Sequence, residues 1–307
     1  MNMNSGIQFW LKKFRMRVVF PVLALLPSKL SYALATFIGF LDWKYLNTTE
    51  RMEVAQQMQQ IPVFDAALIE QYSKRFCQLM ARDTLDSYRM PRMTASNTGH
   101  QFEVLGLEHL VAAENKGKGV LLLVPHYGRY FMLGPALRFL GHGFGVFTTA
   151  ITEATAPDEN WRTYLTQKLK NGFMFCQGEW ITSDDSPMRI YACLKAGNSL
   201  LMAFDGVEST SDKKLSLPFL GGTAQLATGS LRIAKRTGAA MIYVSVKEHA
   251  GGLKFELTAL SDDPEVALHA AAALLEKDIE EMPWHWWLWR ALPRVWSKDF
   301  RASQDRN

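Results

Sequence analysis

Residues 50–95 carry apolar side chains at helical spacing. Val54, Met58 and Ile61 share one helical face. A second face is formed by Leu68, Tyr72, Phe76, Leu79 and Met80. Pro91 ends the pattern, because proline has no backbone N–H to donate within a helix. The spacing therefore predicts helices over most of this stretch.

From Phe102 onward, short apolar runs alternate with segments of helical periodicity. The predicted strands are residues 119–124, 144–149, 173–176, 199–204, 240–246 and 253–259. The predicted helices are residues 130–140, 160–170, 187–195, 224–237 and 264–282. Such alternation is typical of the α/β class, a mostly parallel sheet flanked by helices. The short, glycine-containing segment 248–252 predicts a hairpin between the last two strands.

The N-terminal residues 1–41 combine apolar runs with positive charge. They contain no Asp or Glu, and their cations are Lys12, Lys13, Arg15, Arg17 and Lys29. The apolar runs 18–26 and 30–41 are both shorter than the ~20 residues that cross a bilayer. The polar break at residues 27–29 is a poor signal-peptide cleavage site.

We therefore expect two short helices that lie on a membrane surface, where each cation contributes about 1 kcal/mol near anionic lipid. The alternative is that these helices only cap the enzyme core. On this reading residues 1–95 form a helical membrane-associating region, and residues 96–307 form an α/β domain.

Composition and charge exclude several classes of protein. A net charge of +4 over 307 residues does not indicate a nucleic-acid binder. The three cysteines, Cys77, Cys176 and Cys193, form no CxxC pair, and the seven histidines show no zinc spacing. No phosphate loop or dinucleotide fingerprint is present. We predict no metal, no cofactor and a reducing compartment.

The candidate chemistry lies directly after the apolar run 119–124. Pro125, His126, Tyr127, Gly128 and Arg129 follow it, at the point where sites form beyond strand ends in α/β sheets. Histidine suits the removal of a proton near neutral pH, as acyl transfer to a hydroxyl or amine requires. Position alone leaves a structural role for this histidine open.

Residues 124–131 resemble the signature of the lysophospholipid acyltransferase superfamily, in its branch of late acyltransferases of lipid A biosynthesis. His126, Tyr127, Gly128 and Tyr130 match that signature, and Arg129 replaces an Asn. Further matching blocks follow in the same order along the chain, at residues 200–206, 217–221, 228–239 and 283–290. The resemblance implies transfer from a carrier-protein thioester to a lipid A-type glycolipid, at the cytoplasmic face of the inner membrane.

Phe131 is the main departure from the family pattern. The family has an Asp or Glu at this position, and that acid orients the histidine ring. Another carboxylate would then take this role. Asp205 is our first candidate, because it ends a neighbouring predicted strand and the family retains it, although such an acid can also be structural. Glu153 is the second candidate, because it follows the strand predicted at residues 144–149.

Two other interpretations of Phe131 remain open. The transferred group can be an amino acid such as glycine, as in carrier-dependent relatives that modify lipid A, lower the surface charge and confer resistance to antimicrobial peptides. The chain can also be a lipid-binding relative that has lost catalysis.

The remaining candidates concern substrate binding. We assign Tyr127, Gly128, Arg129 and Arg232 to this role. The two arginines are placed to contact phosphate, with an ordinary surface arginine as the alternative for each. The backbone near Gly128 is the predicted oxyanion site. The Trp-rich segment 284–296, with its flanking cations, predicts either contact with lipid headgroups or packing on the core.

Overall fold

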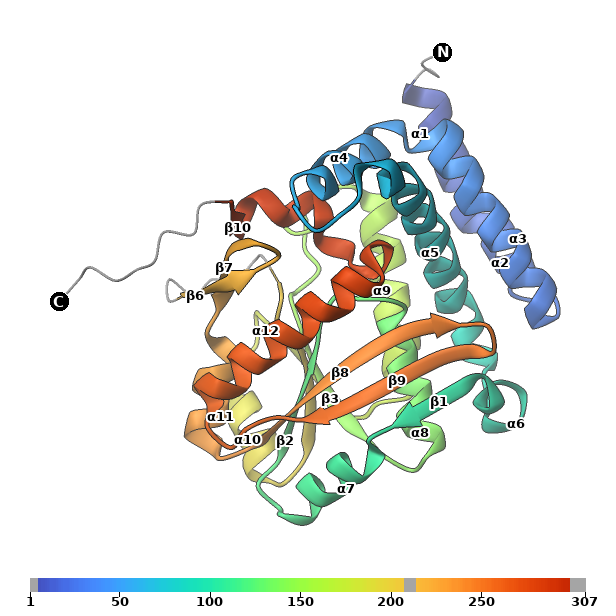
Figure 1. The fold of residues 1–307 in the computed structure, drawn as a ribbon. Coiled ribbons are helices and arrows are strands. Elements are labelled where there is room, and N and C mark those ends of the chain that lie inside the picture. The colour runs from blue at the N-terminus through green and yellow to red at the C-terminus, as the bar shows by residue number, and fades with distance from the viewer. Residues whose placement is uncertain (1–4, 207–213, 299–307) are drawn as a thin grey trace.

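A seven-stranded sheet forms the centre of the molecule (Figure 1). The computed structural model describes residues 5–206 and 214–298. In spatial order the strands are β1 (Phe102–Leu105), β9 (Gly252–Ala259), β8 (Ala240–His249), β2 (Val120–Val124), β5 (Ser199–Ala203), β3 (Phe144–Thr148) and β4 (Gln177–Thr182). Every neighbouring pair is parallel except the antiparallel hairpin β8–β9. The α/β class and the hairpin are therefore confirmed.

Helices cover both faces of this sheet. They are α7 (Leu107–Asn115), α8 (Leu133–Phe139), α9 (Glu159–Phe173), α10 (Met188–Lys195), α11 (Gly229–Thr237) and α12 (Pro264–Glu281). All five residues of β2 are buried, and successive side chains point to opposite faces. Leu121 and Leu123 join the core under α10, α11 and α12. Leu122 joins the core under α7 and α8, which explains the unbroken apolar run in the sequence.

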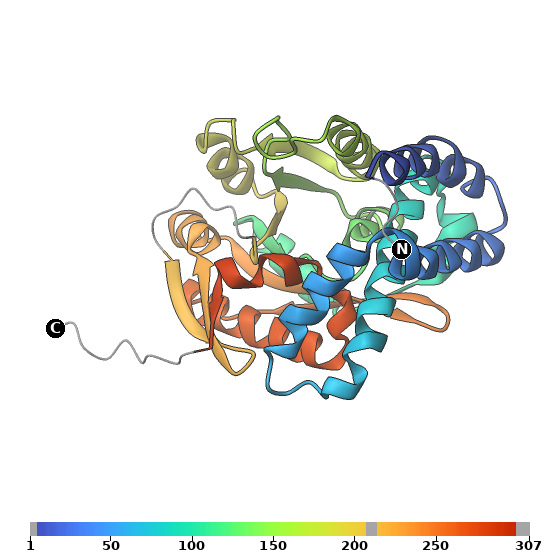
Figure 2. The ribbon, with the colours of Figure 1, turned by 90° about the horizontal axis from the view of Figure 1, so that it is seen from above.

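The N-terminal part is helical, with more elements than the apolar runs indicate. It contains α1 (Ser5–Phe14), a π-helical turn (Arg15–Val19), α2 (Phe20–Leu23), α3 (Ser28–Leu41), a second π-helical turn (Asp42–Leu46), α4 (Thr48–Gln59) and α5 (Ile69–Arg89). Figures 1 and 2 show α3 lying along α5. At Gly39 of α3 an added Cβ would come within 2.5 Å of Gln78 Cα, so only glycine allows this approach. Within the described ranges, no helix combines the length and the apolar character needed to span a bilayer.

Two local predictions were wrong. Residues 173–176 end α9 and form a turn, and the strand β4 begins only at Gln177. Phe175 and Cys176 are apolar because they are buried beneath the sheet, and a short apolar run does not separate strand from turn. The predicted helix 224–237 begins as a strand, and the helix α11 starts only at Gly229. The strand β7 (Gly222–Ala227) pairs with β6 (Lys214–Phe219) and β10 (Trp296–Ser297) in a second, antiparallel sheet.

One hydrophobic cluster joins residues from both sides of the division predicted at residue 95. Met58 and Phe76 lie in it together with Tyr127 and Trp289. The N-terminal helices therefore share a core with the sheet that carries the candidate site. The division remains a prediction about the roles of the two parts.

Candidate active site

His126 and Asp205 meet at one edge of the central sheet. The strands β2 and β5 are adjacent and parallel, with Val124 paired to Ala203. Each candidate lies two residues beyond its strand, so the two side chains project from neighbouring strand ends. The Nδ1–H of His126 donates to Asp205 Oδ1 over 2.8 Å, and the backbone N–H of His126 donates to the same carboxylate at 3.0 and 3.1 Å.

The Trp-rich segment holds this arrangement from the other side. The indole Nε1 of Trp286 donates to Asp205 Oδ2 over 3.0 Å. The backbone N–H of Trp287 donates to the His126 carbonyl, and its indole donates to the Gly128 carbonyl, both over 2.9 Å. Trp286 and Trp289 are buried, so this part of the segment packs on the core and supports the site.

The surroundings set the protonation of His126. Burial lowers the pKa of His126, but the charge and hydrogen bond of Asp205 raise it, and the net shift is upward from the ordinary 6.5. Lys168 contributes a smaller downward effect on the same pKa. With Nδ1 bound to Asp205, Nε2 is the ring nitrogen that remains for a substrate proton. This is the arrangement of a general base oriented by a carboxylate.

A cavity of about 1660 Å³ surrounds the histidine, whose side chain is 26% exposed. Apolar residues of its wall include Phe131, Phe147, Trp180, Ile190, Phe204 and Leu288. Cations line other parts of it, among them Lys12, Arg15, Arg232, Arg290 and Arg294. The cavity is larger than most small-molecule sites, which occupy about 300–1,000 Å³. It can hold a long acyl chain together with polar groups.

Tyr127 and Gly128 shape the loop and do not face the cavity, contrary to the substrate-binding role predicted for them. The hydroxyl of Tyr127 is buried and donates to the Asp278 carbonyl over 2.7 Å. Gly128 has φ +63°, and an added Cβ would lie 2.1 Å from the Val246 carbonyl oxygen. Its N–H donates to the His285 carbonyl at 2.8 Å, so it is not available to an oxyanion.

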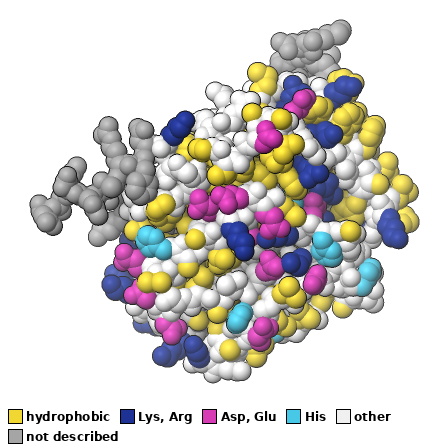
Figure 3. All heavy atoms as spheres, in the orientation of Figure 1, with side chains coloured by type: hydrophobic (Ala, Val, Ile, Leu, Met, Phe, Trp, Pro, Cys, Tyr) yellow, Lys and Arg dark blue, Asp and Glu magenta, His cyan; other side chains and the backbone are white. Residues whose placement is uncertain are grey.

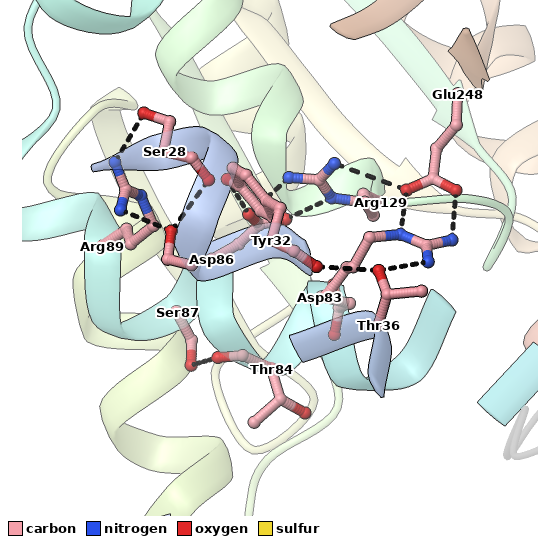
Figure 4. A network of polar contacts seen from close by, with 12 residues as sticks. Ser28, Tyr32, Thr36, Asp83, Thr84, Asp86, Ser87, Arg89, Arg129 and Glu248 are labelled. Carbon is pink, nitrogen blue, oxygen red and sulfur yellow. Dashed lines mark hydrogen bonds and ion pairs between the residues drawn. The ribbon is translucent and has the colours of Figure 1, made fainter. Parts of the chain in front are cut away.

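Arg129 is buried in an ion-pair network, which contradicts the predicted phosphate contact (Figure 4). Its Nε and Nη2 donate to both oxygens of Asp86 at 2.6 and 2.5 Å. Nη1 lies 3.4 Å from Glu248, and the guanidinium stacks over the Tyr32 ring at 4.6 Å. Arg82 also holds Glu248, through two bonds of 2.7 and 2.6 Å. Arg129 therefore ties the loop to α3, α5 and the β8–β9 hairpin.

The other predicted residues lie apart from His126. The Glu153 side chain is 89% exposed and lies 3.6 Å from Arg162, so the structure corrects its proposed role in orienting the histidine. Arg232 is exposed on α11 and lines the same cavity as His126.

The structure adds a charged pair that the sequence did not indicate. Lys168 of α9 and Asp83 of α5 form a buried ion pair in the wall of the same cavity. The two residues are distant in the chain, and each looks like an ordinary helix-surface residue in its own periodic pattern. No spacing rule would have joined them.

The chain matches known proteins over most of its length. The model of the family "Bacterial lipid A biosynthesis acyltransferase" matches residues 7–294. The chain is 23% identical over 210 residues to a phosphatidylinositol mannoside acyltransferase of Mycolicibacterium smegmatis, and this aligned stretch covers 67% of each protein. It is 22% identical over 242 residues to the protein of that name from Mycobacterium tuberculosis, covering 78% of this chain and 72% of the relative. The chain is thus an acyltransferase that belongs to the bacterial lipid A biosynthesis acyltransferase family.

Proposed function

We propose that the enzyme transfers an acyl group from a carrier-protein thioester to a hydroxyl of a lipid A-type glycolipid. The observation that carries this proposal is the 2.8 Å bond between His126 Nδ1 and Asp205, in a large cavity with an apolar wall. The family name supports a lipid A-type acceptor, and the relatives named for phosphatidylinositol mannoside support a glycolipid.

In this reaction His126 acts as general base. Its Nε2 takes the proton of the acceptor hydroxyl while the hydroxyl oxygen attacks the thioester carbonyl carbon. Asp205 stabilises the imidazolium that results and holds the ring in place. The tetrahedral intermediate then breaks its carbon–sulfur bond, and the leaving thiolate takes the proton from Nε2. Asp205, just beyond the end of β5, thereby takes the role of the carboxylate that the family carries at position 131.

We place the reaction at the cytoplasmic face of the inner membrane, with α1–α3 on the lipid surface. Figure 3 shows hydrophobic side chains interspersed with cations along this edge of the molecule. The large apolar side chains exposed there are Trp10, Leu11, Phe14, Val18, Val22, Leu25, Leu30 and Phe37. Side chains of Lys12, Lys13 and Arg15 from the same helical layer line the cavity, which favours lipid entry from this side.

The test is a gene deletion in the native host, complemented with wild type, His126→Ala or His142→Ala. Intact lipid A is then compared by mass spectrometry. We expect loss of one acyl mass in the deletion, restored by wild type but not by His126→Ala. His142 is a matched control, because it also bonds a carboxylate, Glu114, at 2.9 Å but does not line the cavity. Full restoration by His126→Ala would overturn the proposal.

A second candidate is transfer of an amino acid from a carrier protein, which would lower the surface charge and favour resistance to antimicrobial peptides. The buried carboxylate of Asp83 in the cavity wall favours it, because Asp83 Oδ1 has no hydrogen-bond partner and could attract an ammonium group. Loss of a small aminoacyl mass in the deletion, in place of a fatty-acyl mass, would support this donor.

A further inference from the structure

The ion pair between Lys168 and Asp83 has no part in the mechanism described so far. Lys168 Nζ bonds Asp83 Oδ2, and the two side chains are only 2% and 5% exposed. A pair buried this deeply loses the hydration of both charges, and apolar residues of equal size often give more stability. Its presence beside a reaction cavity therefore calls for a role other than stability.

Aromatic rings connect this pair to the catalytic histidine. The Lys168 ammonium lies 4.2 Å from the centre of the Phe131 ring and 4.7 Å from that of Trp287. Tyr130 packs on both of these rings, at 4.7 and 5.0 Å, and its own ring is 5.6 Å from the imidazole of His126. Phe131, which replaces the acid of the family pattern, thus provides a face for a cation.

Two charged side chains among the described residues shift the pKa of His126 in opposite directions. Asp205, at the end of β5, raises the pKa of the imidazole, and Lys168, on α9, lowers it. Asp83 reaches His126 only through Lys168, since it carries the charge that balances this lysine. Arg129 with Asp86 and Glu248 forms a neighbouring cluster around Tyr32, and Asp86 and Arg129 also act on the pKa of Asp83, in opposite directions.

Asp83 is a weak counter-charge for this lysine. Its Oδ1 has no hydrogen-bond partner, and burial raises the pKa of Asp83 to about 6, although Lys168 acts in the opposite direction. The lysine's charge also acts on its other neighbours, the rings of Phe131 and Trp287, which pack on Tyr130 beside the histidine. Without this cation, only burial would oppose Asp205, and more of the imidazole would be protonated and unable to accept a proton.

We propose that Lys168 is a positioning residue for the catalytic base: its charge, moderated by Asp83, opposes Asp205 and limits the protonation of His126 between turnovers. This inference rests on the proposed role of His126 as the base. It assigns a purpose to the buried pair, to the unpartnered oxygen of Asp83 and to the aromatic residue at position 131.

The test is an NMR titration of the full-length protein labelled at histidine, with the His126 signal identified from His126→Ala. In Lys168→Met we expect the His126 pKa to rise by about one unit, because the opposing charge is lost. In Asp83→Asn we expect it to fall, because the lysine is no longer balanced. Lys170→Met is the control, since Lys170 is exposed on the same helix, and it should leave the pKa unchanged.

Opposite shifts in the two single variants distinguish this proposal from a structural role, which would move both in one direction or neither. Shifts of the His126 pKa in the same direction in both variants, or no shift in either, would overturn the proposal. If a single variant fails to fold, the double variant Asp83→Leu with Lys168→Met is used instead. It replaces both charges by apolar side chains and so retains the packing. Its His126 pKa should exceed that of the wild type, because the lysine is the nearer charge, and an unchanged or lower value would overturn the proposal.

A pH–rate profile separates this inference from the proposed function. If His126 is the base, the acid limb of the rate profile moves with the titration in each variant. If the His126 pKa shifts in opposite directions in the two variants but the His126→Ala enzyme is active, the electrostatic coupling stands and the role of His126 as base is refuted. An inactive His126→Ala enzyme, with an unshifted His126 pKa in the Lys168 and Asp83 variants, would support the base and refute the electrostatic coupling.

Discussion

At the scale of single residues, the site depends on one carboxylate that replaces another. Asp205 accepts the histidine ring N–H, the histidine backbone N–H and the Trp286 indole N–H, so both of its oxygens are occupied. A carboxylate held by three donors cannot easily rotate. It therefore fixes one tautomer of His126, in which Nε2 carries the lone pair that the proposed mechanism requires.

Asp205→Asn tests this arrangement directly. An amide of nearly the same shape keeps the packing but does not stabilise the imidazolium, so we expect kcat to fall by more than about tenfold with the fold retained. Steady-state kinetics with a carrier-protein thioester, together with circular dichroism, measure both. Glu153→Gln, on an exposed side chain, is the control and should keep the wild-type rate. A near-normal rate in Asp205→Asn would remove this residue from the mechanism.

The pH dependence follows from the same contact. A base must be unprotonated, and the pKa of His126 is raised above 6.5 because Asp205 outweighs burial. The rate should therefore rise with pH through a midpoint above 6.5. In Asp205→Asn the residual rate should show a midpoint at lower pH, because the raising charge is gone. A midpoint below 6.5 in the wild type would contradict this assignment.

At the scale of elements, Arg129 joins the loop after β2 to three other parts of the chain. Its partners are Asp86 of α5, Tyr32 of α3 and Glu248 at the β8–β9 hairpin. Burial raises the pKa of Glu248, but the neighbouring His285, Arg82 and Arg129 reverse this effect and hold the pKa well below its usual range. The network is therefore charged, and removing its arginine leaves carboxylates buried without compensation.

We expect Arg129→Met to lower the free energy of unfolding by about 3–5 kcal/mol, the range for breaking one side of a buried ion pair. Urea unfolding followed by tryptophan fluorescence gives the value. Arg138→Met, on the exposed side of α8, is the matched control and should change stability by less than about 0.5 kcal/mol. A loss below about 1 kcal/mol for Arg129→Met would show that the network is not essential.

The same elements show what the sequence can and cannot predict. The strand β2 was predictable, because burial on both faces leaves an unbroken apolar run. The meeting of His126 and Asp205 was predictable too, because parallel strands end at one edge. The burial of Arg129 was not, since its main partner, Asp86, is 43 positions earlier on a helix whose orientation only the folded chain determines. The pair of Asp83 and Lys168 escaped prediction for the same reason.

At the scale of the whole molecule, the N-terminal helices present an apolar edge with few acidic groups. Phe14, Val22 and Leu25 are 57%, 53% and 63% exposed on this edge. Changing all three to Gln should weaken binding to anionic vesicles by about tenfold or more, because the apolar area available to lipid is lost. The control changes Leu105, Val111 and Met188, which are exposed elsewhere, to Gln. Vesicle co-sedimentation measures both, and equal binding would refute the membrane face.

The order of the site along the chain also has a consequence for how the protein is made. Asp205 follows His126 by 79 positions, and the Trp286 indole that holds it follows by a further 81. A ribosome adds about 5–20 residues per second, so the helices α1–α3 emerge on the order of ten seconds before the last contact of the site exists. A nascent chain thus carries the N-terminal helices well before His126, Asp205 and Trp286 can meet.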